Sequence, residues 1–300
     1  MSERWSGVFP AVTTQFRKDQ SLDLEATAKH LEAVVAAGVQ GLVVCGSLGE
    51  NQTLSPEEKR KVVENALRVA NKKIPVVVGV AETSTASATS YVRDCEKLGV
   101  SGFMVMPPMV YKPDADEAAA YFRAVAAATG LPWMLYNNPI AYTVDVTPER
   151  LVGYTDIRNL VAIKESSGDP RRVTEIRLLL GDRLALFAGV DDLILESSIL
   201  GIDGWVAGSG IAFPKENQHI WNLTRSGKWE EARQLYRWAA PLMKLDTNPK
   251  FVQYIKLLIQ EAGLGAEWVR EPRQTLQGAE RERVLKIIRD GLSNRPTITK

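Results

Sequence analysis

The sequence is poor in the residues from which metal centres, disulfide frameworks and hydrolytic triads are built. Only two of its 300 residues are cysteines and only two are histidines. Cys45 and Cys95 are too few for a disulfide framework, so we expect a reduced, cytoplasmic setting. His30 and His219 fall in segments of helical pattern without metal-ligand spacing to the cysteines, so we expect no metal centre. A Ser–His–Asp triad would need a histidine at a strand end, and neither histidine lies at one.

An excess of charge of one sign and long apolar runs are also lacking. The 37 Lys and Arg residues balance 36 Asp and Glu residues, for a formal net charge of +1. Such a balance creates no field that would attract nucleic acid. No apolar run reaches the length of a membrane span, and the opening "MSERWSGVFP" lacks the apolar core of a signal peptide. We therefore expect a soluble protein that acts on a small molecule, with neither nucleic acid nor a membrane as a partner.

Short apolar runs alternate with longer segments of helical period. The runs predict eight strands, at Gly7–Thr14, Gly41–Cys45, Pro75–Ala81, Gly102–Pro107, Pro132–Asn137, Leu160–Ser166, Leu184–Gly189 and Gly204–Gly208. Near-continuous apolar strands separated by helices indicate a parallel sheet that is covered on its faces. Eight of them in about 210 residues favour a (β/α)₈ TIM barrel. An open doubly wound sheet is the main alternative, but no G-x-G-x-x-G follows the first strand.

The rest of the chain is helical in pattern and exceeds what a barrel needs. We expect the barrel at residues 1–226 and a C-terminal helical extension at 227–300, packed on the barrel or on a neighbouring subunit. A helix predicted at Phe251–Ala262 has an apolar face that includes Phe251, Ile255 and Leu258, which suggests assembly into an oligomer. Lys256 in this helix shares a polar face with Gln253 and Gln260 and needs no special role.

Function in such barrels lies at the carboxyl ends of the strands and in the loops that follow them. Four segments occupy those places, and each alone could be a simple turn. They are "CGSLGENQTLS", "LYNNP", "IKESSGD" and "AGVDD".

Lys164 is the strongest candidate, because it follows four apolar residues of a strand that reads as buried. Burial without a paired anion lowers the pKa of a lysine, and a neutral amine attacks a ketone or imine to form a Schiff base. The alternative is an ion pair with Glu165 or another carboxylate. Glu165 should point to the opposite face of the strand, which makes it a poor partner.

Two hydroxyl groups could serve such a lysine. Tyr136 ends the fifth strand and can carry protons if its pKa is lowered or if it joins a relay. In "GSLGE", glycines such as Gly46 let the backbone approach a ligand, and the Ser47 hydroxyl could bond to a carboxylate or to Tyr136.

Taken together, "GVFPAVTTQF", "GSLGE", "YNNP", "IKESSGD" and "AGVDD", in this order and spacing, resemble the dihydrodipicolinate synthase/N-acetylneuraminate lyase family. The resemblance covers nearly the whole chain. It implies that Lys164 is the Schiff-base lysine, Tyr136 the proton-relay tyrosine and Ser47 the relay hydroxyl. It also implies a substrate pocket bordered by four further residues, Gly46, Leu48, Gly189 and Val206, with Leu48 in place of a usual hydroxyl residue.

The sequence departs from the synthases of this family at two places. They carry an arginine two residues past the proline of the tyrosine motif, to hold the carboxylate of the aldehyde substrate, and here Ala141 stands at that position. They also take a second relay tyrosine from the neighbouring subunit, and the matching position is Val110, next to Tyr111. Both departures argue against a role in lysine biosynthesis.

Four stretches are most similar to the branch that deaminates 1-pyrroline-4-hydroxy-2-carboxylate in hydroxyproline breakdown: "FPAVTTQFRKDQSLDL", "VCGSLGENQTL", "FAGVDD" and "LDTNPKFVQYIKL". This resemblance implies a homotetramer that releases 2-oxoglutarate semialdehyde and ammonia and needs no cofactor. Two alternatives stay open: a dehydratase or aldolase for a 2-keto-3-deoxy sugar acid, and a non-catalytic barrel that binds an oxo acid.

Overall fold

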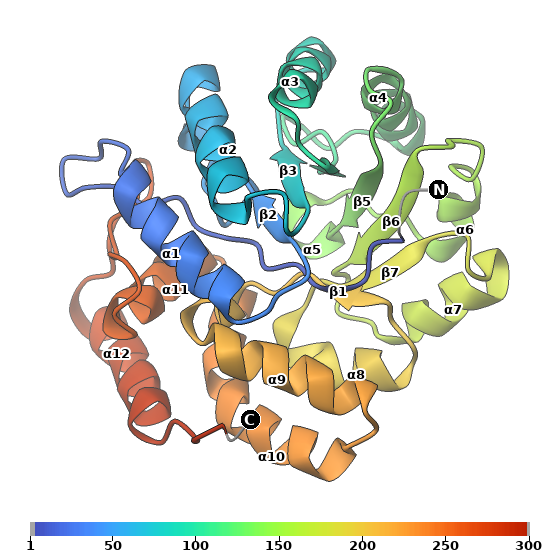
Figure 1. Ribbon diagram of the computed structural model, residues 1–300. Coiled ribbons are helices and arrows are strands. Elements are labelled where there is room, and N and C mark those ends of the chain that lie inside the picture. Colours follow the sequence, from blue (N-terminus) through green and yellow to red (C-terminus); the bar gives the residue numbers. More distant parts are fainter. Residues whose placement is uncertain (1–3, 299–300) are drawn as a thin grey trace.

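Eight parallel strands form the centre of the structure, and helices surround them (Figure 1). This computed structural model describes residues 4–298. The strand order is β1-β8-β7-β6-β5-β4-β3-β2. A parallel bridge between Ala11 and Val43 brings the two end strands together, so the sheet closes on itself. The predicted (β/α)₈ barrel is confirmed.

Each strand lies within one of the predicted runs and is shorter than it. The strands are β1 (Gly7–Val8), β2 (Leu42–Val44), β3 (Val76–Val80), β4 (Gly102–Val105), β5 (Trp133–Asn137), β6 (Leu160–Glu165), β7 (Ala185–Ala188) and β8 (Gly204–Trp205). All their residues are buried except Val161 and Glu165, which are half-buried. Burial on both faces explains why the runs are apolar throughout instead of alternating with polar residues.

The barrel helices follow the strands in the usual alternation. They are α1 (Leu24–Ala36), α2 (Pro56–Ala70), α3 (Thr85–Leu98), α4 (Ala115–Ala127), α5 (Pro139–Tyr142), α6 (Pro148–Val152), α7 (Arg171–Leu180), α8 (Ile194–Ile199) and α9 (Pro214–Arg225). Their starts are set by local chemistry. In α2, for example, Ser55 is the N-cap, Pro56 follows it, and Glu58 completes a capping box.

Three further helices extend the barrel at its C-terminal end: α10 (Trp229–Met243), α11 (Phe251–Glu261) and α12 (Gly278–Ser293). The helix α12 packs on both α10 and α11. Ile255 and Leu258 of α11 are fully buried within the chain, and Phe251 is half-buried and packed against the core. The apolar face of α11 therefore belongs to the core of one subunit, and the expectation that it serves an oligomer contact is wrong. The helices α9 and α10 are separated next to the boundary that the sequence predicts between residues 226 and 227. The division of the chain at this boundary stays a prediction.

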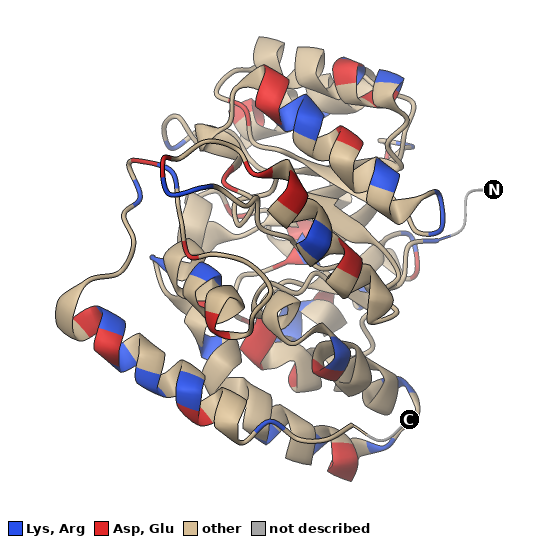
Figure 2. Ribbon diagram, turned by 60° about the vertical axis from the view of Figure 1, so that its left-hand side comes forward, with Lys and Arg blue, Asp and Glu red and all other residues tan. Residues whose placement is uncertain are grey.

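The outer surface is mixed in charge. Figure 2 shows basic and acidic residues interleaved along the surrounding helices. Within residues 4–298, no helix combines the length and the apolar character needed to cross a membrane.

Candidate active site

Lys164 lies in β6 with its side chain inside the barrel. Its register partners in the adjacent strands are Tyr136 of β5 and Phe187 of β7. The residue is 7% exposed. Glu165 points to the other face, as predicted, where its carboxylate accepts hydrogen bonds from the Asn137 side chain at 3.0 Å and from the Ser167 backbone N–H at 2.6 Å. Glu165 is therefore not the partner of Lys164.

The surroundings of Lys164 favour its neutral form. Among the described residues, no carboxylate lies within ion-pair distance of its Nζ atom. Burial lowers the pKa of Lys164, and the negative charge of Asp246 is the strongest of the opposing influences. Burial therefore shifts Lys164 toward the neutral amine, which is the form that attacks a carbonyl or imine carbon.

Tyr136 lies directly against this amine. The Nζ atom of Lys164 is 4.1 Å from the centroid of the Tyr136 ring. The Tyr136 hydroxyl accepts a hydrogen bond from the Asn138 side chain at 3.1 Å. Burial raises the pKa of Tyr136 to about 12, although Asn138 and the Tyr142 hydroxyl act in the opposite direction. Tyr136 is therefore protonated at neutral pH, which favours the relay version of its predicted role.

The hydroxyl of Ser47 bonds to Tyr142, and Tyr142 stands between Ser47 and Tyr136. The Ser47 and Tyr142 hydroxyls are in short hydrogen-bond contact. The Tyr142 ring packs edge-on against the Tyr136 ring, with centroids 5.5 Å apart. Of the two predicted partners of Ser47, a carboxylate or Tyr136, the second is thus approached through Tyr142, a residue that the sequence reasoning missed.

Local sequence explains the position of Tyr142. Asn138 caps the one-turn helix α5 through a bond from the Ala141 backbone N–H, and Pro139 occupies its first position. One helical turn after Asn138 returns the chain toward the end of β5, which places Tyr142 beside Tyr136. The "NP" dipeptide was the available signal for this turn.

Two carboxylates lie near Lys164. Asp191, just after β7, accepts hydrogen bonds from the Trp205 indole at 3.0 Å, from the Ser209 backbone N–H at 2.7 Å and from the Ser209 hydroxyl at 2.6 Å. It ties the loop after β7 to the loop after β8. In residues 4–298 no group of three or more side chains is placed to hold a metal ion.

Asp246, which the sequence reasoning also missed, comes from the segment between α10 and α11. It reaches so close to Gly208 that a Cβ at Gly208 would lie 2.7 Å from its Oδ2 atom. Burial raises the pKa of Asp246 to about 8, with Asp191 adding to the rise and Lys164 opposing it. The C-terminal extension therefore contributes a carboxyl group to the surroundings of Lys164.

The four predicted pocket residues lie on the loops and strand ends of the same barrel face. A Cβ at Gly189 would clash with the Ser166 hydroxyl and lie 2.6 Å from Lys164 Cε. Only a glycine at position 189 therefore leaves room for the Lys164 side chain. Val206 is buried beyond β8, and its N–H bonds to Ala188. Gly46 and Leu48 are buried in the loop after β2. Their contacts with a substrate stay predictions.

The loop that carries Ser47 is anchored to the extension through a buried ion pair. Lys256 of α11 is 0% exposed, and its Nζ lies 2.6 Å from Glu50 Oε1. It also donates to the Trp268 carbonyl at 2.7 Å. The expectation that Lys256 lies on an unremarkable polar face is wrong, because helical spacing shows which residues share a face but not what covers it.

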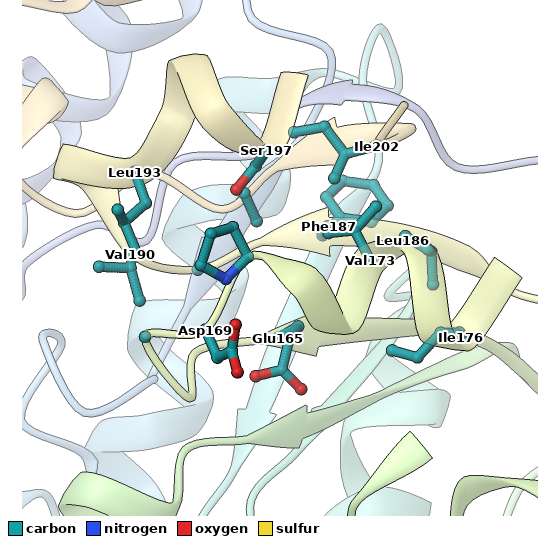
Figure 3. Close-up of a pocket in the computed structure, with 14 residues that line it drawn as sticks. Glu165, Asp169, Val173, Ile176, Leu186, Phe187, Val190, Leu193, Ser197 and Ile202 are labelled. Atoms are coloured by element: carbon teal, nitrogen blue, oxygen red, sulfur yellow. The ribbon is translucent and has the colours of Figure 1, made fainter. Parts of the chain in front are cut away.

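A separate pocket lies behind β6 and β7, under α7 and α8 (Figure 3). Glu165, Val173, Leu193 and Ser197 are among the residues that line it. Of the predicted site residues, Gly189 lines it, whereas Lys164, Tyr136 and Ser47 do not. This pocket is therefore on the other side of the strand layer from the lysine.

Comparison with known proteins gives a family for this arrangement. A model described as the dihydrodipicolinate synthetase family matches residues 4–290. The chain belongs to this family. It is 31% identical over 288 residues to the 4-hydroxy-tetrahydrodipicolinate synthase of Thermodesulfovibrio yellowstonii, a match that covers 95% of this chain and 98% of that protein.

Solved structures of the dihydrodipicolinate synthetase family agree with the fold. The dihydrodipicolinate synthase of Acinetobacter baumannii complexed with pyruvate has a TM-score of 0.89 at 28% identity, and the match covers 96% of this chain and 99% of that one. A monomeric dihydrodipicolinate synthase variant has a TM-score of 0.87 at 28% identity, with 96% of each chain covered. As a member of this family, the protein is an enzyme, a class I lyase that works through a lysine Schiff base.

Proposed function

We propose that Lys164 is the lysine that forms the Schiff base and that the enzyme deaminates 1-pyrroline-4-hydroxy-2-carboxylate. The observation that carries the assignment of Lys164 is its burial against Tyr136 without an ion-pair partner among the described residues. The choice of substrate is supported by the motif similarity and by Ala141, an exposed, uncharged residue of α5 where the synthases carry an arginine. A cyclic imine with one carboxylate does not need that second cation.

The proposed reaction begins with attack of the Lys164 amine on the C2 imine carbon. Ring opening then leaves a lysine-linked imine at C2 and a free amine at C5. Removal of a C3 proton gives an enamine, which expels the C4 hydroxyl as water. The lysine acts as an electron sink, so that one difficult elimination is divided into easier steps.

The remaining steps release both products. Proton transfer from C5 to C3 moves the double bond to C4–C5 and gives an enamine, which gains a proton at C4 and loses one from nitrogen to form an imine at C5. Hydrolysis at C5 releases ammonia, and hydrolysis at C2 frees Lys164 and 2-oxoglutarate semialdehyde. Two waters are consumed and one is released, and no net oxidation occurs, so the proposed scheme needs no metal or organic cofactor. Tyr136 carries the C3 proton, and Ser47 belongs to the relay behind it.

A substrate panel tests this assignment. We would measure ammonia and pyruvate release with the cyclic imine, with 2-keto-3-deoxy sugar acids, and with pyruvate plus aspartate semialdehyde. We expect ammonia from the cyclic imine, abolished in Lys164→Arg, which keeps the charge but is a poor nucleophile. Pyruvate release or dehydration of a sugar acid would favour the alternative lyase. Binding of oxo acids without any turnover would favour the non-catalytic barrel.

We also propose that the subunits assemble as a homotetramer in the cytoplasm. Leu178 of α7 is 81% exposed and Ile199 of α8 is 67% exposed, so an apolar surface lies over these neighbouring helices. A second copy of the chain would cover it. The free, buried Cys45 and Cys95 are compatible with a reducing compartment. Light scattering at micromolar concentration that shows only a species near 33 kDa would refute the tetramer.

A further inference from the structure

Tyr142 connects the most buried part of the site to a residue near the solvent. Its hydroxyl bonds to Ser47, and its ring packs edge-on against Tyr136. Tyr136 in turn lies against the Lys164 amine. Ser47 is half-buried, whereas Tyr136 and Lys164 are buried. The three hydroxyl-bearing residues therefore form a series that runs outward from the amine.

The influences on the pKa of Tyr142 agree with a series from Lys164 through Tyr136 and Tyr142 to Ser47. Burial dominates and raises the pKa of Tyr142, while the Ser47 hydroxyl and the Lys164 charge lower it. A phenol in these surroundings stays protonated at neutral pH, so it transfers protons by donating one as it accepts another. Such an exchange requires hydrogen-bonding groups on both sides: the Ser47 hydroxyl bonds to Tyr142 on one side, and the Tyr136 hydroxyl, whose ring packs on that of Tyr142, interacts with it on the other.

Tyr111, the other tyrosine that the sequence offers for a proton relay, is not part of this series. Tyr111 is 57% exposed, and Val110 beside it is 65% exposed. Glu117, in the first turn of α4, raises the pKa of Tyr111. In this chain the Ser47 hydroxyl is already bonded to Tyr142.

We propose that Tyr142 is the middle member of a Ser47–Tyr142–Tyr136 proton relay, which each chain completes without a tyrosine from another subunit. When Tyr136 takes the C3 proton of the Schiff base, its own hydroxyl proton passes to Tyr142, and that of Tyr142 passes to Ser47 and on to water. Reprotonation reverses the direction. No atom is lost from the protein and no oxidant is needed. Because Tyr142 acts through Tyr136, it is a positioning and relay residue.

The inference rests on the Schiff-base role of Lys164 but not on the identity of the natural substrate. Pyruvate is therefore a suitable probe. Its Schiff base with Lys164 can form an enamine by losing a methyl proton, and in D₂O the methyl group then gains deuterium. Exchange followed by NMR reports proton transfer, and borohydride trapping followed by mass spectrometry reports Schiff-base formation separately.

We would compare four proteins: the wild type, Tyr142→Phe, Ser47→Ala and Tyr111→Phe. Phenylalanine at 142 keeps the ring that packs on Tyr136 and removes only the hydroxyl. We expect Tyr142→Phe to form the trapped adduct as the wild type does but to exchange about 10²-fold more slowly. Small buffer acids such as imidazole should partly restore exchange in Tyr142→Phe, an effect that a packing role would not produce. Ser47→Ala should behave similarly, and Tyr111→Phe should exchange at the wild-type rate.

Several results would overturn the relay. Wild-type exchange in Tyr142→Phe would exclude it, and slowed exchange in Tyr111→Phe would indicate that the tyrosine of another segment carries the proton. Loss of the trapped adduct in Tyr142→Phe would show a structural role instead. If the wild type itself formed no adduct at Lys164, the proposed function would fail together with the relay. An adduct with normal exchange in Tyr142→Phe would leave the proposed function standing and refute the relay alone.

Discussion

Replacing Lys256 by methionine tests how the C-terminal extension holds the active-site loop. The Lys256 ammonium is buried and lies 2.6 Å from Glu50 Oε1. Burial lowers its pKa to about 8, so it is still charged at pH 7. Methionine fills a similar volume but leaves the fully buried Glu50 carboxylate without this partner. Glu50 stands three residues after Ser47, so its displacement would also disturb the relay.

The magnitude follows from the partners that remain. Removing one member of a buried ion pair costs about 3–5 kcal/mol. Glu50 keeps a hydrogen bond from the Arg270 backbone N–H at 3.1 Å and the Arg273 guanidinium at 3.8 Å. We therefore expect the lower end of the range, about 3 kcal/mol. For a chain of 300 residues with an unfolding entropy of about 2.1 cal/mol/K per residue, this lowers Tm by about 5 °C.

Calorimetry at pH 7 on three variants checks the argument. Lys256→Met should melt about 5 °C below the wild type. Glu50→Gln combined with Lys256→Met should recover most of that loss, because no buried charge is left unpaired. The matched control is Lys286→Met, which removes a 75% exposed lysine paired with Asp290 and should lower Tm by at most about 1 °C. A Lys256→Met protein as stable as the control, or a double variant less stable than Lys256→Met, would refute the reasoning.

Three further substitutions probe the lysine and its neighbours. Tyr136→Phe should bind substrate but lose about 10²–10⁴-fold in turnover, since the proton carrier disappears while the ring remains; near-normal turnover in steady-state assays would move the role to another group. Asp246→Asn should increase borohydride trapping above about pH 8, where Asp246 is ionised and its charge raises the pKa of Lys164, and should have little effect at lower pH, where Asp246 is already protonated. The exposed Glu32→Gln is its control, and unchanged or reduced trapping above about pH 8 in Asp246→Asn would contradict the coupling. Gly189→Ala would place a methyl group 2.6 Å from Lys164 Cε and should slow adduct formation about 10²-fold, whereas Gly130→Ala, where a Cβ meets nothing within 4 Å, should leave the rate unchanged.

The strands and the main pair of the site could be predicted from sequence because their signals are local. A strand buried on both faces must be apolar along its length, so a lysine in one is conspicuous. Tyr136 and Lys164 lie at corresponding positions of adjacent parallel strands, which brings them together once the barrel is recognised. Strand lengths were overestimated, as at β1, because apolar residues continue into the buried loops at the barrel mouth.

The residues that were missed or misread depend on contacts between segments far apart in the chain. Lys256 has the spacing of a surface residue, and only the packing of α11 on the loop of Glu50 buries it. Asp246 follows a helix of the extension and gives no local sign that it enters the barrel. Tyr142 had a local signal, the turn at Asn138 and Pro139, but its partner Ser47 comes from the loop after β2.

Trapping of the Schiff base tests most directly whether burial makes Lys164 the nucleophile. The protein would be reduced with borohydride in the presence of pyruvate or the cyclic imine, and the modified peptide would be mapped by mass spectrometry, with Lys164→Arg as the control. We expect one adduct, on Lys164, and neither adduct nor turnover in the arginine variant. An adduct mapped to another lysine, or an active Lys164→Arg enzyme, would contradict this expectation.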